Sequence, residues 1–172
     1  MATPTTLPAT FTAGQVLTAA QMNDLRGAFR VLQVVTATKA NSFSTTSGTF
    51  VDVTDLSVAI TPTETSNTVL AVVTLQGSQT GGDGAFRLLR DATAIALSTA
   101  GSSTNGFTQV SSSYTNAMFS GAVMFVDSPA TTSATTYKVQ AMAGGGTTYV
   151  NRRGVAADFG GFSSITVMEI SA

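Results

Sequence analysis

The chain has 172 residues, enough for one domain with its own core but too few for two ordinary domains and a linker. Its net charge of -1, from 8 basic and 9 acidic residues, excludes the strongly basic surface by which proteins grip nucleic acid. Cysteine and histidine are both absent, which excludes disulfides, thiolate metal sites and catalysis by either side chain.

Hydrophobic residues make up 43% of the chain and charged residues only 10%, whereas about 25% charged is typical of soluble domains. This balance predicts some apolar surface that other subunits cover. The N-terminus lacks the basic start and apolar stretch of a secretory signal, and no run approaches the ~18 apolar residues of a membrane span. We therefore expect no membrane partner, and assembly in a cytoplasm.

The chain begins with a segment, 1–16, whose composition is typical of an extended arm. Pro4, Pro8 and Gly14 interrupt regular structure there, and threonines are scattered between them. Leu7 and Phe11 are spaced along the arm as they would be if it lay on the surface of another protein.

One helix is predicted, over 17–32. Thr18 and Gln21 form a capping box, and Leu17 and Met22 flank it at the positions of a hydrophobic staple. The apolar positions of the helix, which lie on one seam of a heptad, are Met22, Leu25, Phe29 and Leu32. This seam either packs on the chain's own β domain or joins identical chains in a short helical bundle, and we prefer the bundle.

Strands follow from Val31 to the C-terminus. Short β-branched or alternating runs bounded by turn residues predict strands at 31–35, 50–53, 56–60, 69–75, 85–90, 93–97, 122–126, 136–142, 148–151 and 164–170. The run 69–75 is apolar on both faces, which predicts a central strand covered by a facing sheet and by a neighbouring subunit. Residues 98–117 are polar and predict a long exposed loop or weak hairpin around Asn105-Gly106.

The pattern as a whole is mainly β and predicts an antiparallel, jelly-roll-type β-sandwich preceded by the arm and one short α-helix. We assign 1–30 to an N-terminal arm and helix for attachment and oligomerisation, and 31–172 to the β-sandwich head domain. The absence of helical segments between the strands disfavours parallel βαβ architectures.

Four segments resemble small virion surface and tail-fibre-like structural proteins of tailed bacteriophages. They are 11–23 (FTAGQVLTAAQMN), 57–66 (SVAITPTETS), 86–95 (FRLLRDATAI) and 127–140 (DSPATTSATTYKVQ). The resemblance implies a virion surface protein, a homotrimer attached through its N-terminus to other phage proteins of the tail or capsid. It implies no catalytic residue.

Patterns that carry chemistry are weak along the chain. There is no Gly-x-Ser-x-Gly elbow, and the acidic residues, which a glycosidase needs in pairs, stand beside turns where carboxylates are usually solvated. The acidic residues of 52–55 and 81–84 do not follow the ligand order of a calcium loop. We therefore expect no enzyme activity, no cofactor and no metal site.

The function expected is that of a non-enzymatic, fibre-like surface appendage of the virion that aids host adsorption. The alternatives are a capsid decoration protein and a carbohydrate-binding receptor-recognition module; an enzyme that degrades polysaccharide ranks third. The residues expected at the subunit or virion interface are Leu7, Phe11, Leu17, Met22, Leu25, Phe29 and Leu32. Those expected to contact a host surface glycan are Phe107, Tyr114 and Tyr149, whose rings lie in or beside polar loops.

Overall fold

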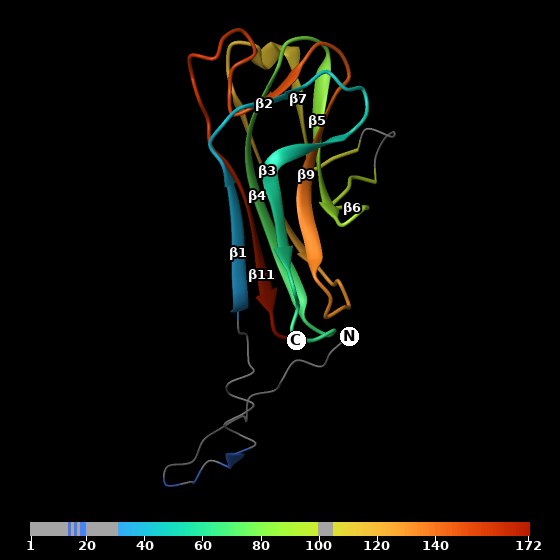
Figure 1. The fold of residues 1–172 in the computed structure, drawn as a ribbon, viewed down its shortest axis with the longest axis vertical. Coiled ribbons are helices and arrows are strands. Elements are labelled where there is room, and N and C mark those ends of the chain that lie inside the picture. Colours follow the sequence, from blue (N-terminus) through green and yellow to red (C-terminus); the bar gives the residue numbers. More distant parts are fainter. Residues whose placement is uncertain (1–13, 15, 17, 20–30, 100–104) are drawn as a thin grey trace.

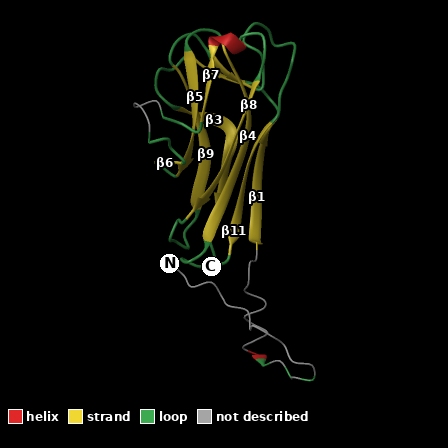
Figure 2. Cartoon of the chain, turned by 180° about the vertical axis from the view of Figure 1, so that it is seen from behind, coloured by secondary structure: helices red, strands yellow, loops and turns green. Residues whose placement is uncertain are grey.

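The computed structural model describes residues 14, 16, 18, 19, 31–99 and 105–172. From Val31 onward the chain forms two antiparallel sheets packed face to face, with the long strands running along the long axis of the head (Figures 1 and 2). The first strand begins beside the end of the last one, where Val31 pairs with Ile170. We call this the proximal end, because residues 1–30 join the head there, and the opposite end the distal end.

The head contains strands of three to twelve residues and one short 3-10 helix, η1 (Ser112–Tyr114). In chain order the strands are β1 (Val31–Lys39), β2 (Phe43–Thr45), β3 (Val51–Ile60), β4 (Thr68–Gln79), β5 (Asp83–Arg90), β6 (Thr93–Ile95), β7 (Thr108–Ser111), β8 (Phe119–Asp127), β9 (Thr135–Ala143), β10 (Thr148–Val150) and β11 (Ser163–Ile170).

Two sheets result from the pairing of these strands. Sheet A has the order β1-β11-β4-β8, and β10 and β2 extend it beside the distal part of β4. Sheet B has the order β3-β9-β5, and β7 and β6 share the outer edge of β5. Apart from the three-residue strands, the first strand pairs with the last, β3 with β9, β4 with β8, and β5 with β7. This nested pairing is the jelly-roll pattern, so the predicted fold class is confirmed.

The core lies between the sheets and follows the period-2 alternation of the strands. Every second residue of β4 is fully buried in it: Val69, Ala71, Val73 and Leu75. Leu88 and Val139 of sheet B are equally buried in the same cluster. The side chains that alternate with them, from Thr68 to Gln76, point to the other face of sheet A.

Several sequence-based expectations are corrected. The helix does not extend to Leu32, because Val31 and Leu32 begin β1, where pairing with β11 prevails over local helix signals. The runs 50–53 and 56–60 belong to one strand, β3, which is interrupted by an irregularity in register at Asp55, a residue with φ 67°. The other interface residues predicted before the head, and most of the predicted helix, lie outside the described residues.

Two strands were missed by the sequence analysis, β2 and β7. β7 lies in the polar segment read as a loop or weak hairpin. Gly106 precedes it, and a Cβ there would overlap the backbone carbonyl oxygen of Phe86. Because glycine has no Cβ, the chain comes close enough for Phe107 N to donate to Phe86 O at 2.9 Å.

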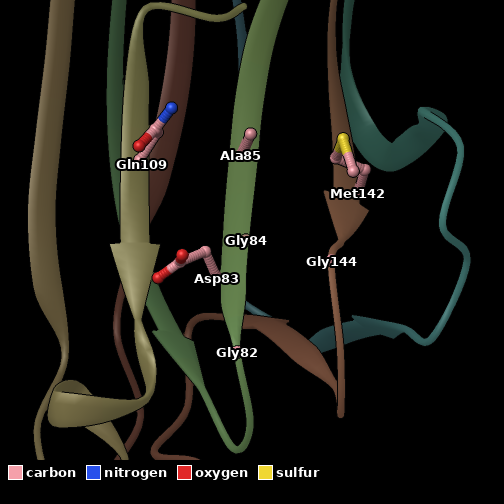
Figure 3. Close-up of a pocket in the computed structure, with 7 residues that line it drawn as sticks. All are labelled: Gly82, Asp83, Gly84, Ala85, Gln109, Met142 and Gly144. Atoms are coloured by element: carbon pink, nitrogen blue, oxygen red, sulfur yellow. The ribbon is translucent and has the colours of Figure 1, made fainter. Parts of the chain in front are cut away.

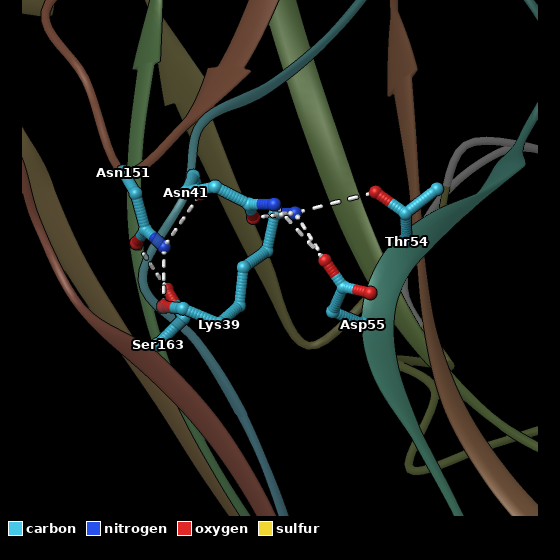
Figure 4. A network of polar contacts seen from close by, with 6 residues as sticks. All are labelled: Lys39, Asn41, Thr54, Asp55, Asn151 and Ser163. Atoms are coloured by element: carbon cyan, nitrogen blue, oxygen red, sulfur yellow. Dashed lines mark hydrogen bonds and ion pairs between the residues drawn. The ribbon is translucent and has the colours of Figure 1, made fainter.

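A buried lysine joins the two sheets towards the distal end (Figure 4). Lys39 ends β1, and its Nζ donates to Asn41 Oδ1 at 2.6 Å and to Thr54 Oγ1 of β3 at 3.2 Å. Asp55 Oδ2 lies 3.5 Å from the same Nζ. Asn151, with φ 60°, supports the turn by donating to Lys39 O at 2.7 Å. Hydrogen-bonded partners offset the cost of removing the ammonium group from water.

A buried carboxylate holds the proximal end together. Glu169 of β11 is fully buried, and its oxygens accept hydrogen bonds from Gln33 Nε2, Asn67 Nδ2 and both the backbone N and Oγ1 of Thr63 at 2.6–2.8 Å. Burial raises the pKa of Glu169, but these hydrogen bonds outweigh it and lower the pKa to about 2. The ionised form therefore ties β1 and the segment after β3 to the last strand.

The depressed pKa predicts a loss of stability in acid. Because the folded-state pKa lies below the ordinary value of 4.5, the stabilising contribution is complete above that pH and is lost as the pH falls towards 2. Glu169→Gln should lower the free energy of unfolding by about 2 kcal/mol at pH 7 and reduce its pH dependence between pH 5 and 2.5. Urea unfolding at a series of pH values measures both effects.

Glu64→Gln is the control for the Glu169 prediction, because it removes an exposed carboxylate that accepts none of these hydrogen bonds. The interpretation is wrong if Glu169→Gln leaves the stability unchanged at pH 7, or if its stability falls with acid as steeply as that of the wild type.

Candidate assembly surface

The four long strands of sheet A carry no charged side chain on their outer face. By alternation from the buried positions, the outward residues are Val34, Thr36 and Thr38 on β1; Ser164, Thr166, Met168 and Ile170 on β11; Thr68, Leu70, Val72, Thr74 and Gln76 on β4; and Ser120, Ala122, Met124 and Val126 on β8. We call this set the outer face of sheet A. A face of four strands without a single charge is unusual for a surface that meets only water.

Apolar side chains form a continuous row across the proximal part of this face. Val34 pairs with Met168, Met168 with Leu70, and Leu70 with Val126, so one row spans all four long strands. In the next row, Val72 pairs with Met124. The residues at the edges are strongly exposed, at 56% for Val34, 59% for Val126 and 70% for Met124. Among the described residues, the row is therefore an apolar patch without a cover.

The distal part of the same face is polar, but its side chains satisfy one another. The hydroxyls of Thr36 and Thr166 are 3.0 Å apart, and those of Thr74 and Ser164 are 2.9 Å apart. Gln76 Nε2 donates to Ser120 Oγ at 3.0 Å. Because these groups already have partners, covering them costs less than covering free polar groups.

The outer face of sheet B is different in kind. Lys138 Nζ lies 2.8 Å from Asp52 Oδ2, and Arg87 donates to Gln140 Oε1 at 2.7 Å while its guanidinium stacks 4.1 Å from the ring of Phe50. Lys138, as a hydrogen-bond donor, lowers the pKa of Asp52 more than the partial burial of this carboxyl raises it. Paired charges of this kind are typical of a solvated face.

A small trough of about 290 Å³ lies on sheet B near the distal end (Figure 3). It is lined by Gly82, Asp83, Gly84, Ala85, Gln109, Met142 and Gly144. Asp83 is its one titratable side chain. A lone carboxylate supplies neither the pair needed for glycoside hydrolysis nor an activated nucleophile.

Other acidic residues of the described chain are engaged in structure. Asp127 accepts from Arg90 at 2.8 Å and from Tyr137 Oη at 2.6 Å. Burial, and then the hydrogen bond to Asp127, raise the pKa of Tyr137. Within the described residues there is no group of three or more potential metal-ligating acidic side chains. No helix among those residues is long and apolar enough to cross a membrane.

The structure separates the three residues predicted to contact a glycan. Phe107 is half-buried and packs against the core beside sheet B. Tyr149 lies on β10 of sheet A, with the guanidinium of Arg152 4.5 Å from its ring. Tyr114 belongs to η1, and its side chain lies outside the described part of the structure. Phe107 and Tyr149 therefore belong to different sheets, and Phe107 has the environment of a packing residue.

The predicted interface residues fall mostly in the segment that the structure leaves undescribed. Leu7, Phe11, Leu17, Met22, Leu25 and Phe29 lie outside the described residues, and Leu32 is a half-buried residue of β1 rather than a helix residue. The outer face of sheet A was missed as a set. Its one sequence signal was the run 69–75, apolar on both faces, which predicted a cover on each side of β4.

No protein-family model and no curated protein sequence matches the chain.

The packing of Phe107 predicts a stability effect. Phe107→Ala should lower the free energy of unfolding by about 2 kcal/mol, less than the 3–5 kcal/mol of a fully buried phenylalanine, because the ring is only half-buried. Phe159→Ala, at a ring that is 58% exposed, is the matched control and should cost under about 1 kcal/mol. Urea unfolding measures both. Equal effects at the two positions would contradict a packing role.

Proposed function

We propose that this protein is a non-enzymatic structural protein of a tailed-phage virion, a homotrimer whose heads associate through the outer face of sheet A and whose residues 1–30 attach it to the particle. The observation that carries the proposal is the uncharged outer face, with its apolar row across all four long strands. The virion location comes from the resemblance of the sequence segments.

The energetics of the apolar row support association. Removing apolar surface from water yields roughly 25 cal/mol per Å², so covering several half-exposed Val, Leu and Met side chains favours association by several kcal/mol. The outer face has no charge whose desolvation opposes this gain. Sheet B has paired charges outside and offers no comparable surface.

The position of the first strand supports attachment through the N-terminus. Val31 begins β1 at the proximal end, so residues 1–30 continue from that end of the head. The loops at the distal end, including the glycine turns 81–84 and 144–146, are then free to face away from the particle (Figure 1).

Two alternatives share this geometry. A capsid decoration protein would use the same assembly surface on a different part of the virion. A carbohydrate-binding module is favoured by the trough on sheet B, where the side chains of Asp83 and Gln109 line the depression and make no hydrogen bond within the described chain (Figure 3). Binding of the purified protein to host cells distinguishes receptor recognition from simple decoration.

A charge placed on the apolar row should break the assembly. Met124→Asp puts a carboxylate among Val72, Val126 and their neighbours, and burying it against another copy would cost several kcal/mol. We expect light scattering to give three times the 17.5 kDa chain mass for the wild type and the single-chain mass for the variant. Circular dichroism checks that both remain folded.

Ala59→Asp is the matched control for the Met124 prediction, since it adds the same carboxylate to an exposed position on β3 of sheet B. It should leave the trimer intact. A monomeric wild type, or a Met124→Asp variant with the wild-type mass, would contradict assembly through this surface.

Deletion of residues 1–30 should separate folding from attachment. The deletion leaves every described strand and the whole described core, so the head should remain folded and trimeric. Particles assembled in the presence of the deleted form should lack it, whereas they should incorporate the full-length chain, as gel analysis of purified particles would show. Normal incorporation of the deleted form would overturn the attachment role.

A further inference from the structure

The two edges of sheet A lack the features that normally protect an exposed strand. β1 and β8 are both nine-residue strands, and no described strand pairs with the outer side of either. Neither contains proline. The one charged residue of each strand, Lys39 or Asp127, is buried, so neither edge presents a charge to an approaching strand. Such edges invite association with another chain.

Sheet B protects its edges in the usual ways. β3 is interrupted between Asp52 and Ser57, where Asp55 has φ 67° and both aspartates are exposed. At the other edge the strands are short, three residues in β6 and four in β7. Bulges, exposed charges and short strands all discourage edge pairing. The contrast singles out sheet A as the sheet whose edges another copy covers.

The polarity of the strands determines how copies fit together. Neighbouring strands of β1-β11-β4-β8 alternate in direction, so β8 runs antiparallel to β1. Rotation about an axis parallel to the strands preserves these directions and brings β8 of one copy beside β1 of the next in antiparallel orientation. A twofold axis perpendicular to the strands would instead place like edges together and leave the other edge of each copy open.

The flat outer face of sheet A is by itself too small for an ordinary interface between two copies. Four strands about 4.8 Å apart and about 30 Å long give roughly 600 Å² when a side chain's width is added, below the ~800 Å² per partner of an ordinary interface. Two edges of a sandwich about 10 Å thick add roughly 600 Å². A copy that uses its face and both edges therefore offers about 600 Å² to each of two neighbours, near the lower limit for a specific contact.

We propose that the heads associate head-to-tail around a threefold axis parallel to the strands, with the β8 edge of one copy against the β1 edge of the next and the apolar rows turned towards the axis. This inference rests on the trimer of the proposed function and specifies which surfaces of its subunits meet. The partner at each edge is a second copy of this chain.

Engineered cysteines test this arrangement, because the chain has no cysteine of its own. Thr38 of β1 and Ala122 of β8 lie in one cross-sheet row, through Ser164 and Thr74, and both are exposed. The full-length double variant Thr38→Cys/Ala122→Cys should form covalent dimers and closed trimers on mild oxidation or with a short bis-maleimide, which tolerates a stagger between copies. Non-reducing gel electrophoresis measures the products.

Three controls make the outcome decisive. Each single variant should give almost no covalent dimer, because a head-to-tail contact joins unlike edges. The pair Ala59→Cys/Gln109→Cys, on β3 and β7 of sheet B, should give none either. Light scattering of the reduced double variant should give a trimer mass.

The outcomes separate this inference from the proposed function. A trimer by light scattering that yields no crosslink from Thr38→Cys/Ala122→Cys overturns the edge contact and leaves the trimer standing. Covalent dimers from either single variant overturn it in favour of a twofold contact between like edges. A monomer by light scattering overturns the trimer itself, and the edge contact with it.

Discussion

The proximal part of sheet A is apolar on both faces, and a two-layer sandwich can cover only one of them. Val69, Ala71, Val73 and Leu75 of β4 fill the core, while Leu70 and Val72 of the same strand point away from it. The alternation of a strand allows no other arrangement of a run that is apolar throughout. A cover for the second apolar face must come from outside the two sheets, and the proposed assembly would supply it.

The small number of charged residues affects both the interior and the surface of the head. With only 10% charged residues, the chain places some of its ionic groups where they join elements, as Glu169 does at the proximal end and Lys39 between the sheets. Each of these buried groups is surrounded by hydrogen-bonding partners. The outer face of sheet A is left without charge, so no ionic group there would have to be desolvated when copies associate.

The same scarcity of charged and reactive side chains limits the chemistry available to the head. Histidine and cysteine are absent, Asp127 is held by Arg90 and Tyr137, and Glu169 is enclosed by donors. What the head offers to partners is surface: one uncharged sheet face with two open edges, and a shallow trough with two hydrogen-bonding side chains at the distal end. These are the features on which the proposed assembly and binding roles rest.

The sequence by itself determined the strands and the fold class, because alternation and turn residues are local signals. Nine of the observed strands contain runs that the sequence predicted. The strand β7 was missed because its polar residues resemble a loop. Leu32 was misassigned to the helix because local helix signals carry no information about pairing with β11. The run 69–75 also indicated a second cover for β4.

Only the tertiary structure decided which residues share a surface. Val34, Met168, Leu70 and Val126 form one row because the nested pairing of the jelly roll places the first strand against the last and β4 between β11 and β8. Each of these residues is unremarkable within its own strand. Their common face arises from contacts between distant parts of the chain, and no local pattern encodes such contacts.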